Sequence, residues 1–214
     1  MIDLHTHSSF SDGELIPSEL VRRAVVKGYK AIAITDHADF TNIEHVLSCI
    51  KTVKFLEDDY DIQIFVGVEL THVPPAKMPR LVEKARYLGA EIIVVHGETI
   101  VEPVSPGTNH MAVSLDINIL AHPGLITVED AELARENDIT LEITSRNGHN
   151  RTNGHVVRMG KETGANLTVN TDTHAPEDLI TDETAFNIAM GAGLDQKGAR
   201  AATISQPLNI IKSL

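Results

Sequence analysis

Two histidines separated by a single residue, His5 and His7, follow the first short apolar stretch of the chain. Histidine is the commonest metal ligand among side chains, and five residues after His7 an aspartate, Asp12, precedes a glycine. A His-x-His pair at this place also occurs as an ordinary polar strand end. The pair alone does not distinguish a metal site from a polar strand end. The distinction depends on whether residues of the same types recur further along the chain.

Metal-binding residue types recur at the ends of five further apolar runs. A single histidine at a strand end is usually a hydrogen-bonded structural residue. No requirement of folding, however, makes six separate runs end in Asp, Glu or His, so the repetition indicates one functional site. After His5 and His7, the residues at the run ends are Asp36 with His37, Glu69, His96, His122, and Asp172 with His174.

The apolar runs are predicted to be strands of a parallel sheet. They are β-branched and almost continuously apolar, which is typical of strands covered on both faces. Amphipathic segments predicted to be helices lie between them, at residues 17–27, 79–88, 129–137 and 151–163. Repeated strand–helix units imply a parallel sheet with right-handed crossovers. The predicted strands cover residues 2–4, 31–35, 62–68, 91–95, 117–121, 139–143 and 166–170.

The fold class expected from these units is α/β, a small β/α barrel that forms a single domain over residues 1–214. A standard eight-fold barrel takes roughly 250 residues, so a shorter barrel fits this chain. The C-terminal ends of all strands of a parallel barrel meet at one face. The strand-end residues are therefore expected to converge, although they lie far apart in sequence.

The predicted ligands outnumber the needs of one metal ion. Zinc takes three or four protein ligands, whereas the strand ends offer six imidazoles and several carboxylates. Mixed nitrogen and oxygen ligands suit two or three ions of Zn, Mn or Fe. Such clusters lower the pKa of bound water and clamp the attacking and leaving oxygens during phosphoryl displacement.

The strand-end residues belong to short motifs that occur in a fixed order. They are His5-x-His7 with Ser11-Asp12-Gly13, then Thr35-Asp36-His37, Gly67-Val68-Glu69, Val95-His96, Ala121-His122-Pro123 and Thr171-Asp172-x-His174. This series resembles the motifs of the PHP family (polymerase and histidinol phosphatase) from residue 2 to about residue 180. The resemblance implies a distorted seven-stranded (β/α)7 TIM-like barrel with a three-metal active site at the C-terminal ends of the strands.

The resemblance also implies how the ligands are shared among the ions. One ion would be held by His5, His7, Glu69 and Asp172, and a second would share Glu69 and add His96 and His122. The third ion would take Asp12, His37 and His174. Some relatives have histidine in place of Asp12. Asp36 is expected among the catalytic residues, where it orients a ligand histidine by a hydrogen bond, or else to cap the following helix.

Arg146 follows the sixth predicted strand and is the expected catalytic and substrate-binding cation. A guanidinium there would bind phosphate through two hydrogen bonds, and the alternative is a surface ion pair. Glu142 is expected either to support the site or to pair with a neighbouring cation. The remaining polar residues considered have weaker claims: His149, Arg151 and His155 as substrate contacts, His110 as a proton donor or a solvated loop residue, and His45 and His72 with no chemical role.

Composition limits the partners and the location. The chain carries 18 Lys and Arg against 30 Asp and Glu, a net charge of −12, which argues against general nucleic-acid binding. No apolar run is long enough to cross a membrane, and no secretory signal is visible. The single cysteine, Cys49, fits a reducing cytoplasm. Nothing in the sequence indicates the oligomeric state.

Three functions follow from these observations. The leading prediction is a metal-dependent phosphoesterase, similar to histidinol-phosphate phosphatase, that uses a metal-bridging hydroxide on a trinuclear site to hydrolyse a small phosphorylated substrate. A two-metal amidohydrolase-like hydrolase is the first alternative, although it has no need of Asp12, His37 and His174. The second is a non-catalytic accessory module similar to a ribonuclease P subunit, which the complete ligand set and the charge of −12 disfavour.

Overall fold

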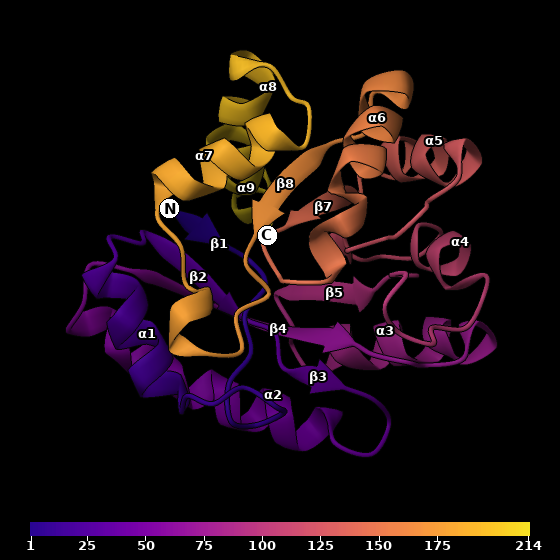
Figure 1. Cartoon of the computed structure of the whole chain (residues 1–214). Coiled ribbons are helices and arrows are strands. Elements are labelled where there is room, and N and C mark those ends of the chain that lie inside the picture. The colour runs from indigo at the N-terminus through magenta and orange to yellow at the C-terminus, as the bar shows by residue number, and fades with distance from the viewer.

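Seven parallel strands form a nearly closed barrel in the computed structural model, which describes residues 1–214 (Figure 1). This architecture confirms the predicted distorted seven-stranded TIM-like barrel. A short additional strand, β3 (His37–Ala38), pairs with β4 and is not one of the seven barrel strands. In spatial order the strands are β1 (Ile2–Asp3), β2 (Ala31–Ile34), β4 (Gln63–Leu70), β5 (Ile92–His96), β6 (Ile119–Ala121), β7 (Thr140–Thr144) and β8 (Leu167–Asn170).

The barrel closes only at the end where the strands finish. No ladder joins β1 to β8, and a single parallel bridge links Thr6 with Thr173. The backbone N–H of His7 donates to the carbonyl of Thr173 at 2.9 Å, and the N–H of Asp172 donates to the carbonyl of His5 at 2.9 Å. The last contact that closes the barrel therefore places the His-x-His segment beside Asp172.

The helices lie outside the strands (Figure 1). The four helices predicted from the sequence correspond to α1, α3, α5 and α6, with ends displaced by at most two residues. None of the helices is long and apolar enough to span a bilayer. The bounds are α1 (Pro17–Val26), α2 (Ile43–Lys51), α3 (Met78–Tyr87), α4 (Thr108–Ala112), α5 (Val128–Glu136), α6 (Asn153–Thr163), α7 (Asp182–Gly191), α8 (Gln196–Arg200) and α9 (Gln206–Lys212).

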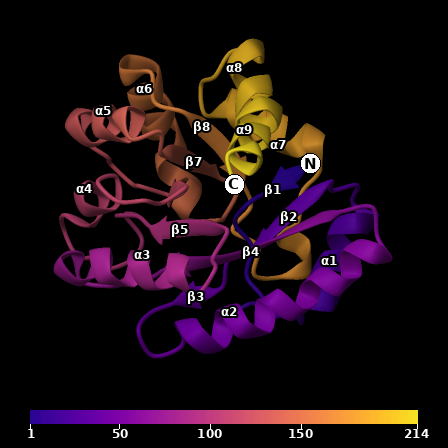
Figure 2. The same ribbon diagram turned by 180° about the vertical axis from the view of Figure 1, so that it is seen from behind.

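Apolar side chains form two separate cores. A cluster of 49 buried residues fills the space between the barrel and its helices. A second cluster of 9 residues fills the barrel itself and includes Leu4, Ala33, Val94 and Ile119. Ile210 of α9 belongs to this inner cluster, and α9 lies next to β1 when the molecule is seen from behind (Figure 2). Apolar residues fill much of the barrel interior, and the expected metal-binding side chains gather at the C-terminal ends of the strands.

Candidate metal centre

The loop after β1 is held by the carboxylate of Asp36. This carboxylate accepts hydrogen bonds from the backbone N–H of Ser8 at 2.8 Å, from Ser8 Oγ at 2.6 Å and from Ser11 Oγ at 2.6 Å. Gly13 completes the turn, since a Cβ there would lie 2.5 Å from the carbonyl oxygen of His7. Asp36 thus fixes the loop between His7 and Asp12, and it neither caps the next helix nor hydrogen-bonds a ligand histidine. Its catalytic role stays a prediction.

Glu69, at the end of β4, lies at the centre of the site and is fully buried. Its Oε2 atom lies 3.4 Å from Nε2 of His5 and 3.5 Å from Nε2 of His7, and its Oε1 lies 3.5 Å from Nε2 of His122. Nδ1 of His37 approaches to 2.7 Å but is hydrogen-bonded to Thr71 Oγ1, and neither Glu69 oxygen receives a hydrogen bond of acceptable geometry. Burial raises the pKa of this carboxyl, but the attraction of His5 and His37 outweighs it and lowers the pKa well below its usual value, so the ionised group fits a site that binds cations.

Asp172 completes the inner part of the site from the other edge of the barrel. Its Oδ1 lies 3.3 Å from Nε2 of His7, and its Oδ2 lies 3.6 Å from Nε2 of His122. Both Asp172 and His122 have left-handed backbones, with φ of 54° and 28°. A non-glycine residue in this region costs of order 1–3 kcal/mol and persists where the surrounding structure imposes it, often at functional sites. The fold therefore holds these two expected ligands at an energetic cost.

The imidazoles of His5 and His7 face each other next to the carboxylates of Glu69 and Asp172. Their Nε2 atoms are 3.1 Å apart, and Nδ1 of His7 has no hydrogen-bond partner. Burial lowers the pKa of His5, but Glu142, Glu69 and Asp172 outweigh it and raise the pKa well above its usual value. Burial and the charge of His37 hold the pKa of His7 well below its usual value. These two imidazoles with two carboxylates match the mixed ligand set of a Zn, Mn or Fe ion.

A second group of ligands lies nearer to solvent. Oδ1 of Asp12 lies 3.5 Å from Nε2 of His37 and 3.2 Å from Nε2 of His174. Nδ1 of His174 is 2.9 Å from the carbonyl oxygen of Asp172 and must carry the hydrogen, because a carbonyl only accepts. Nε2 of His174 is therefore the ring nitrogen that faces Asp12. The structure brings together the trio expected to hold the third ion.

His96 lies in the same cavity as His122, with the two ring centroids 4.5 Å apart, and its role as a ligand of the second ion stays a prediction. The group of potential ligand atoms around Glu69 and His122 contains His5, whereas His96 groups with His72 and Glu102. Nε2 of His96 lies 3.0 Å from Oε2 of Glu102. Neither Glu102 nor His72 was among the expected ligands. No spacing rule identifies Glu102, whose only signal is its place in a long loop at the active end of the barrel.

Glu142, on β7, supports the site from below. Its Oε1 lies 2.8 Å from Nδ1 of His5 and accepts a hydrogen bond from Asn170 Nδ2 at 3.0 Å. Its Oε2 accepts from the backbone N–H of His122 at 3.1 Å. Of the two alternatives expected for Glu142, these contacts are those of a residue that supports the site, and none is with a lysine or arginine. A carboxylate on the far nitrogen of a ligand histidine fixes the tautomer that binds metal.

Of the other polar residues considered, Arg146 and His149 line the cavity. Nη1 of Arg146 is paired with Asp178 Oδ2 at 2.9 Å. His149 donates to or accepts from Thr99 Oγ1 at 2.9 Å. His155 binds the carbonyl oxygen of Ile126 instead, and His45, His110 and Arg151 do not line the cavity.

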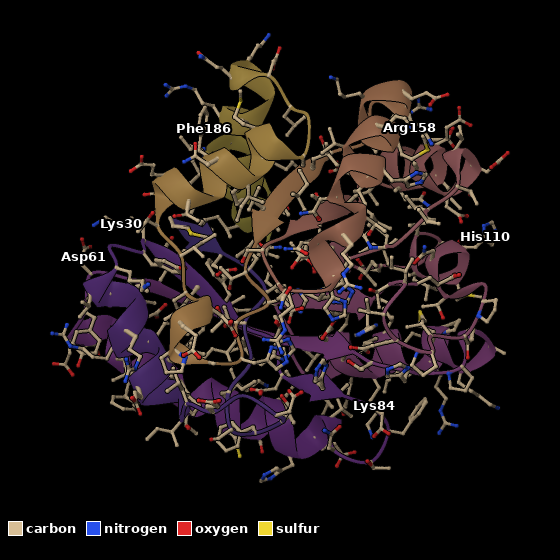
Figure 3. The ribbon with its side chains drawn as sticks, viewed as in Figure 1. Lys30, Asp61, Lys84, His110, Arg158 and Phe186 are labelled. Carbon is tan, nitrogen blue, oxygen red and sulfur yellow. The ribbon has the colours of Figure 1, made fainter.

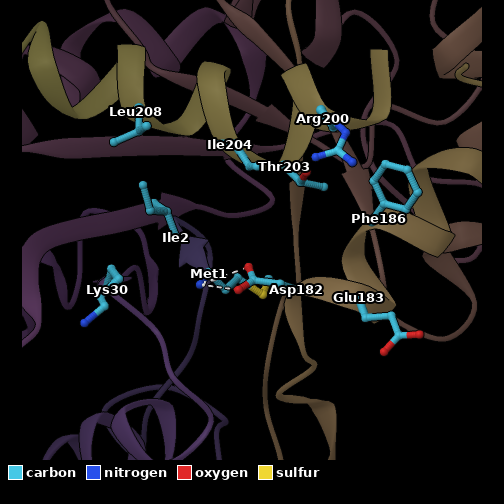
Figure 4. Close-up of a pocket in the computed structure, with 10 residues that line it drawn as sticks. All are labelled: Met1, Ile2, Lys30, Asp182, Glu183, Phe186, Arg200, Thr203, Ile204 and Leu208. Atoms are coloured by element: carbon cyan, nitrogen blue, oxygen red, sulfur yellow. Dashed lines mark hydrogen bonds and ion pairs between the residues drawn. The ribbon is translucent and has the colours of Figure 1, made fainter. Parts of the chain in front are cut away.

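The cavity has a volume of about 70 Å³ and is lined only by polar residues. This is room for a few water molecules or a group of phosphoryl size. A larger cavity of about 520 Å³ lies at the opposite end of the barrel, between Ile2, Phe186 and Leu208 (Figure 4). It contains no histidine or cysteine, and its Asp182 carboxylate is bound to the amino group of Met1 at 2.9 Å. The smaller cavity is therefore the candidate metal-binding cavity. It is lined by Asp12, His37, His96, Glu102, His122, Arg146, His149, Asp172 and His174.

Comparison with known proteins gives a family match and several relatives. Residues 3–156 match the PHP domain. An uncharacterized protein of Methanocaldococcus jannaschii is 54% identical over 99% of both chains. Among solved structures, the histidinol phosphate phosphatase of Lactococcus lactis, complexed with zinc, L-histidinol and phosphate, has a TM-score of 0.65 at 17% identity and covers 91% of this chain and 94% of that one. A chain of an archaeal ribonuclease P bound to mature tRNA has a TM-score of 0.72 at 16% identity, over 100% and 90%. At these identities, the comparison shows that this chain has the same fold as the two structures.

Proposed function

The chain belongs to the PHP domain family, and on this basis we propose that it hydrolyses a small phosphate ester with two or three divalent metal ions. One observation carries the proposal. Imidazoles and carboxylates that follow five strands, together with one guanidinium, line a single cavity of about 70 Å³, and Glu69 from a sixth strand end contacts His37 and His122 of this lining. A site with this many metal ligands and one fixed cation is suited to phosphoryl transfer.

Each group of residues has a distinct part in the proposed reaction. When bound, divalent ions supply Lewis acidity and an activated water molecule. Glu69 and Asp172, with His5, His7 and His122, would hold the inner ions, and Asp12, His37 and His174 the outer one. Glu142 keeps His5 in the tautomer that leaves Nε2 free. Asp36 keeps the loop from His7 to Asp12 in the conformation that binds metal.

Arg146 would bind and orient the phosphate. Its Nη1 is held by Asp178, whose Oδ2 also accepts from the backbone N–H of His174 at 2.9 Å. This anchoring places the guanidinium at the cavity and leaves its other N–H groups for two oxygens of a phosphate. A pre-oriented guanidinium loses less conformational entropy when it binds.

Charge favours a small anionic substrate over a long one. Three divalent ions carry about +6, and the carboxylates of Asp12, Glu69, Glu102, Glu142 and Asp172 return about −5. The loaded cavity would therefore be locally positive within a chain of net charge −12. A phosphate monoester can enter such a cavity, whereas the backbone of a long nucleic acid would be repelled by the surrounding surface.

The test is activity against a panel of phosphate monoesters and diesters, including histidinol phosphate, with Mn, Zn and Fe supplied in turn. We expect turnover of at least one ester that requires added metal. The amidohydrolase-like alternative predicts about two ions per chain and cleavage of an amide or a related bond. The position of the archaeal ribonuclease P chain among similar structures keeps an RNA-associated role as the second alternative, which tight RNA binding without ester hydrolysis would favour.

A further inference from the structure

We propose that Glu102 and His72 are metal ligands and that, with His96, they form a cation-binding position beyond the nine ligands expected from the sequence. The inference rests on the proposed use of metal but not on hydrolysis of a phosphate ester. It assigns a role to a loop glutamate that no motif identifies and to a histidine expected to have none. The position lies at the outer side of the cavity, where Glu102 and His72 are partly exposed.

The geometry around His96 requires a positive group between it and Glu102. Nδ1 of His96 lies 3.1 Å from the carbonyl oxygen of Gly97, and this nitrogen carries the hydrogen because a carbonyl only accepts. Nε2 of the neutral ring therefore points its lone pair at Oε2 of Glu102, 3.0 Å away. A lone pair and a carboxylate oxygen repel each other at this distance unless a proton or a metal ion lies between them.

Glu102 meets three imidazoles and no lysine or arginine. Nε2 of His72 lies 3.2 Å from Oε2, and Nε2 of His149 lies 3.3 Å from Oε1. Ligand atoms bind zinc at about 2.0–2.2 Å, so the distances from Glu102 to these imidazoles are those expected between neighbouring ligands of one ion. The ligand atoms of His72, His96 and Glu102 all lie within 4.8 Å of one another.

The segments that carry these ligands are held in place by the fold. At the base of the Glu102 loop, Glu98 N–H donates to Asn109 Oδ1 and Asn109 N–H donates to Glu98 Oε1, both at 2.9 Å. The Asn109 side chain also donates to the carbonyl oxygen of Pro123 at 2.8 Å. His72 has a left-handed backbone with φ of 53°, as do the ligands Asp172 and His122. The loop is therefore anchored at both ends next to His96.

The test compares metal binding by the full chain with that of Glu102→Gln and His72→Asn. Metal per chain is measured by inductively coupled plasma mass spectrometry after equilibration with Mn²⁺ or Zn²⁺, and affinity by calorimetry. We expect each variant to bind one ion at least about tenfold more weakly, because loss of groups around a metal site costs about 10–100-fold. A crystal structure of the Mn²⁺-loaded chain should show an anomalous peak between the three side chains.

His110→Asn is the matched control. His110 Nδ1 also pairs with a carboxylate, Asp130, at 2.7 Å, but it lies at the outer edge of the molecule with no third ligand nearby (Figure 3). This variant should bind metal as the unmodified chain does. Circular dichroism of each variant verifies folding, which substitutions at these partly exposed positions should preserve.

Unchanged metal content and affinity in both Glu102→Gln and His72→Asn would overturn the inference and leave Glu102 as an ion-pair partner of protonated histidines. An absent anomalous peak at this position would do the same. The proposed function fails separately: a chain that loses an ion in Glu102→Gln but hydrolyses no phosphate ester supports this inference and contradicts the phosphoesterase. A chain that hydrolyses esters with unchanged metal binding in both variants contradicts this inference alone.

Discussion

Glu142 and His5 form a fully buried pair, with Oε1 of the carboxylate 2.8 Å from Nδ1 of the imidazole. The pair spans 137 residues of sequence and joins the first strand of the barrel to β7. The carboxylate keeps a hydrogen on Nδ1, so that Nε2 is the nitrogen that faces Glu69 and Asp172 and can bind a metal ion. The metal centre therefore depends on a residue that does not itself face the cavity.

Glu142→Gln should weaken metal binding about 10–100-fold while the chain stays folded. Glutamine has the same shape but one acceptor fewer, so its amide group would face either His5 or the backbone N–H of His122. Calorimetric titration with Mn²⁺ measures the change. Glu19→Gln, which alters only a surface pair with Arg23, is the control. Equal affinity in the two variants would show that Glu142 does not position His5.

Asp12→Asn should remove the outer ion and leave the others bound. The side chain is exposed and contacts only the outer histidines, His37 and His174, so its loss should not disturb the inner ligands. Metal analysis after dialysis gives the number of ions per chain. About two ions in both the unmodified chain and the variant would instead support a two-metal hydrolase.

Arg146→Ala should reduce kcat/KM for the best phosphate ester about 10- to 100-fold, because charge-assisted hydrogen bonds contribute about 1.5–3 kcal/mol each. Competition by inorganic phosphate should weaken in parallel, since the guanidinium is proposed to bind that group. Asp178→Asn, which keeps the guanidinium but loosens its anchor, should have a smaller effect. A full effect on kcat with unchanged phosphate inhibition would contradict a phosphate-binding role.

Metal affinity should increase as the pH rises toward 9. Burial lowers the pKa of His37, but Glu69, Asp12 and Asp172 outweigh it and raise the pKa from 6.5 to about 9 in the metal-free chain. Metal binding requires the neutral ring, so uptake at neutral pH must release a proton. Titrations in two buffers of different ionisation enthalpy count the protons released. The number should fall in His37→Asn, and release of none from the unmodified chain would refute the shift.

The same shift predicts how the metal-free fold responds to pH. A histidine whose pKa is higher in the folded than in the unfolded state stabilises the fold fully below the unfolded value of 6.5. That stabilisation is lost as the pH rises through about 9. The melting temperature of the metal-free chain should fall over this range, and His37→Asn should show a smaller fall.

The barrel and most of the site could be predicted from the sequence because both depend on local patterns. Continuous apolar runs require burial on both faces, and parallel strands bring their C-terminal ends together. The sequence alone therefore predicts that Glu69, His122 and Asp172 lie at one centre. Backbone hydrogen bonds between residues 5–7 and 171–173 close the barrel and bring His5 and His7 next to Asp172.

The parts that sequence did not identify depend on loop conformation. Glu102 has no apolar run before it, and only the folded 97–109 loop brings it to His96. His72 was expected to have no chemical role, and the role proposed for it depends on a left-handed backbone that its neighbours in sequence do not predict. Asp36 was expected to orient a ligand histidine or to cap a helix, whereas its contacts with Ser8 and Ser11 depend on a turn that the sequence does not specify.

Hydrolysis of phosphate esters by metal-free and metal-reloaded protein tests the central claim most directly. The chain stripped with a chelator should be inactive on the ester panel, and Mn, Zn or Fe should restore turnover. His122→Ala, which removes an inner ligand, should stay inactive after reloading although it remains folded. Turnover that survives complete metal removal, or near-native activity of reloaded His122→Ala, would contradict a metal-dependent phosphoesterase.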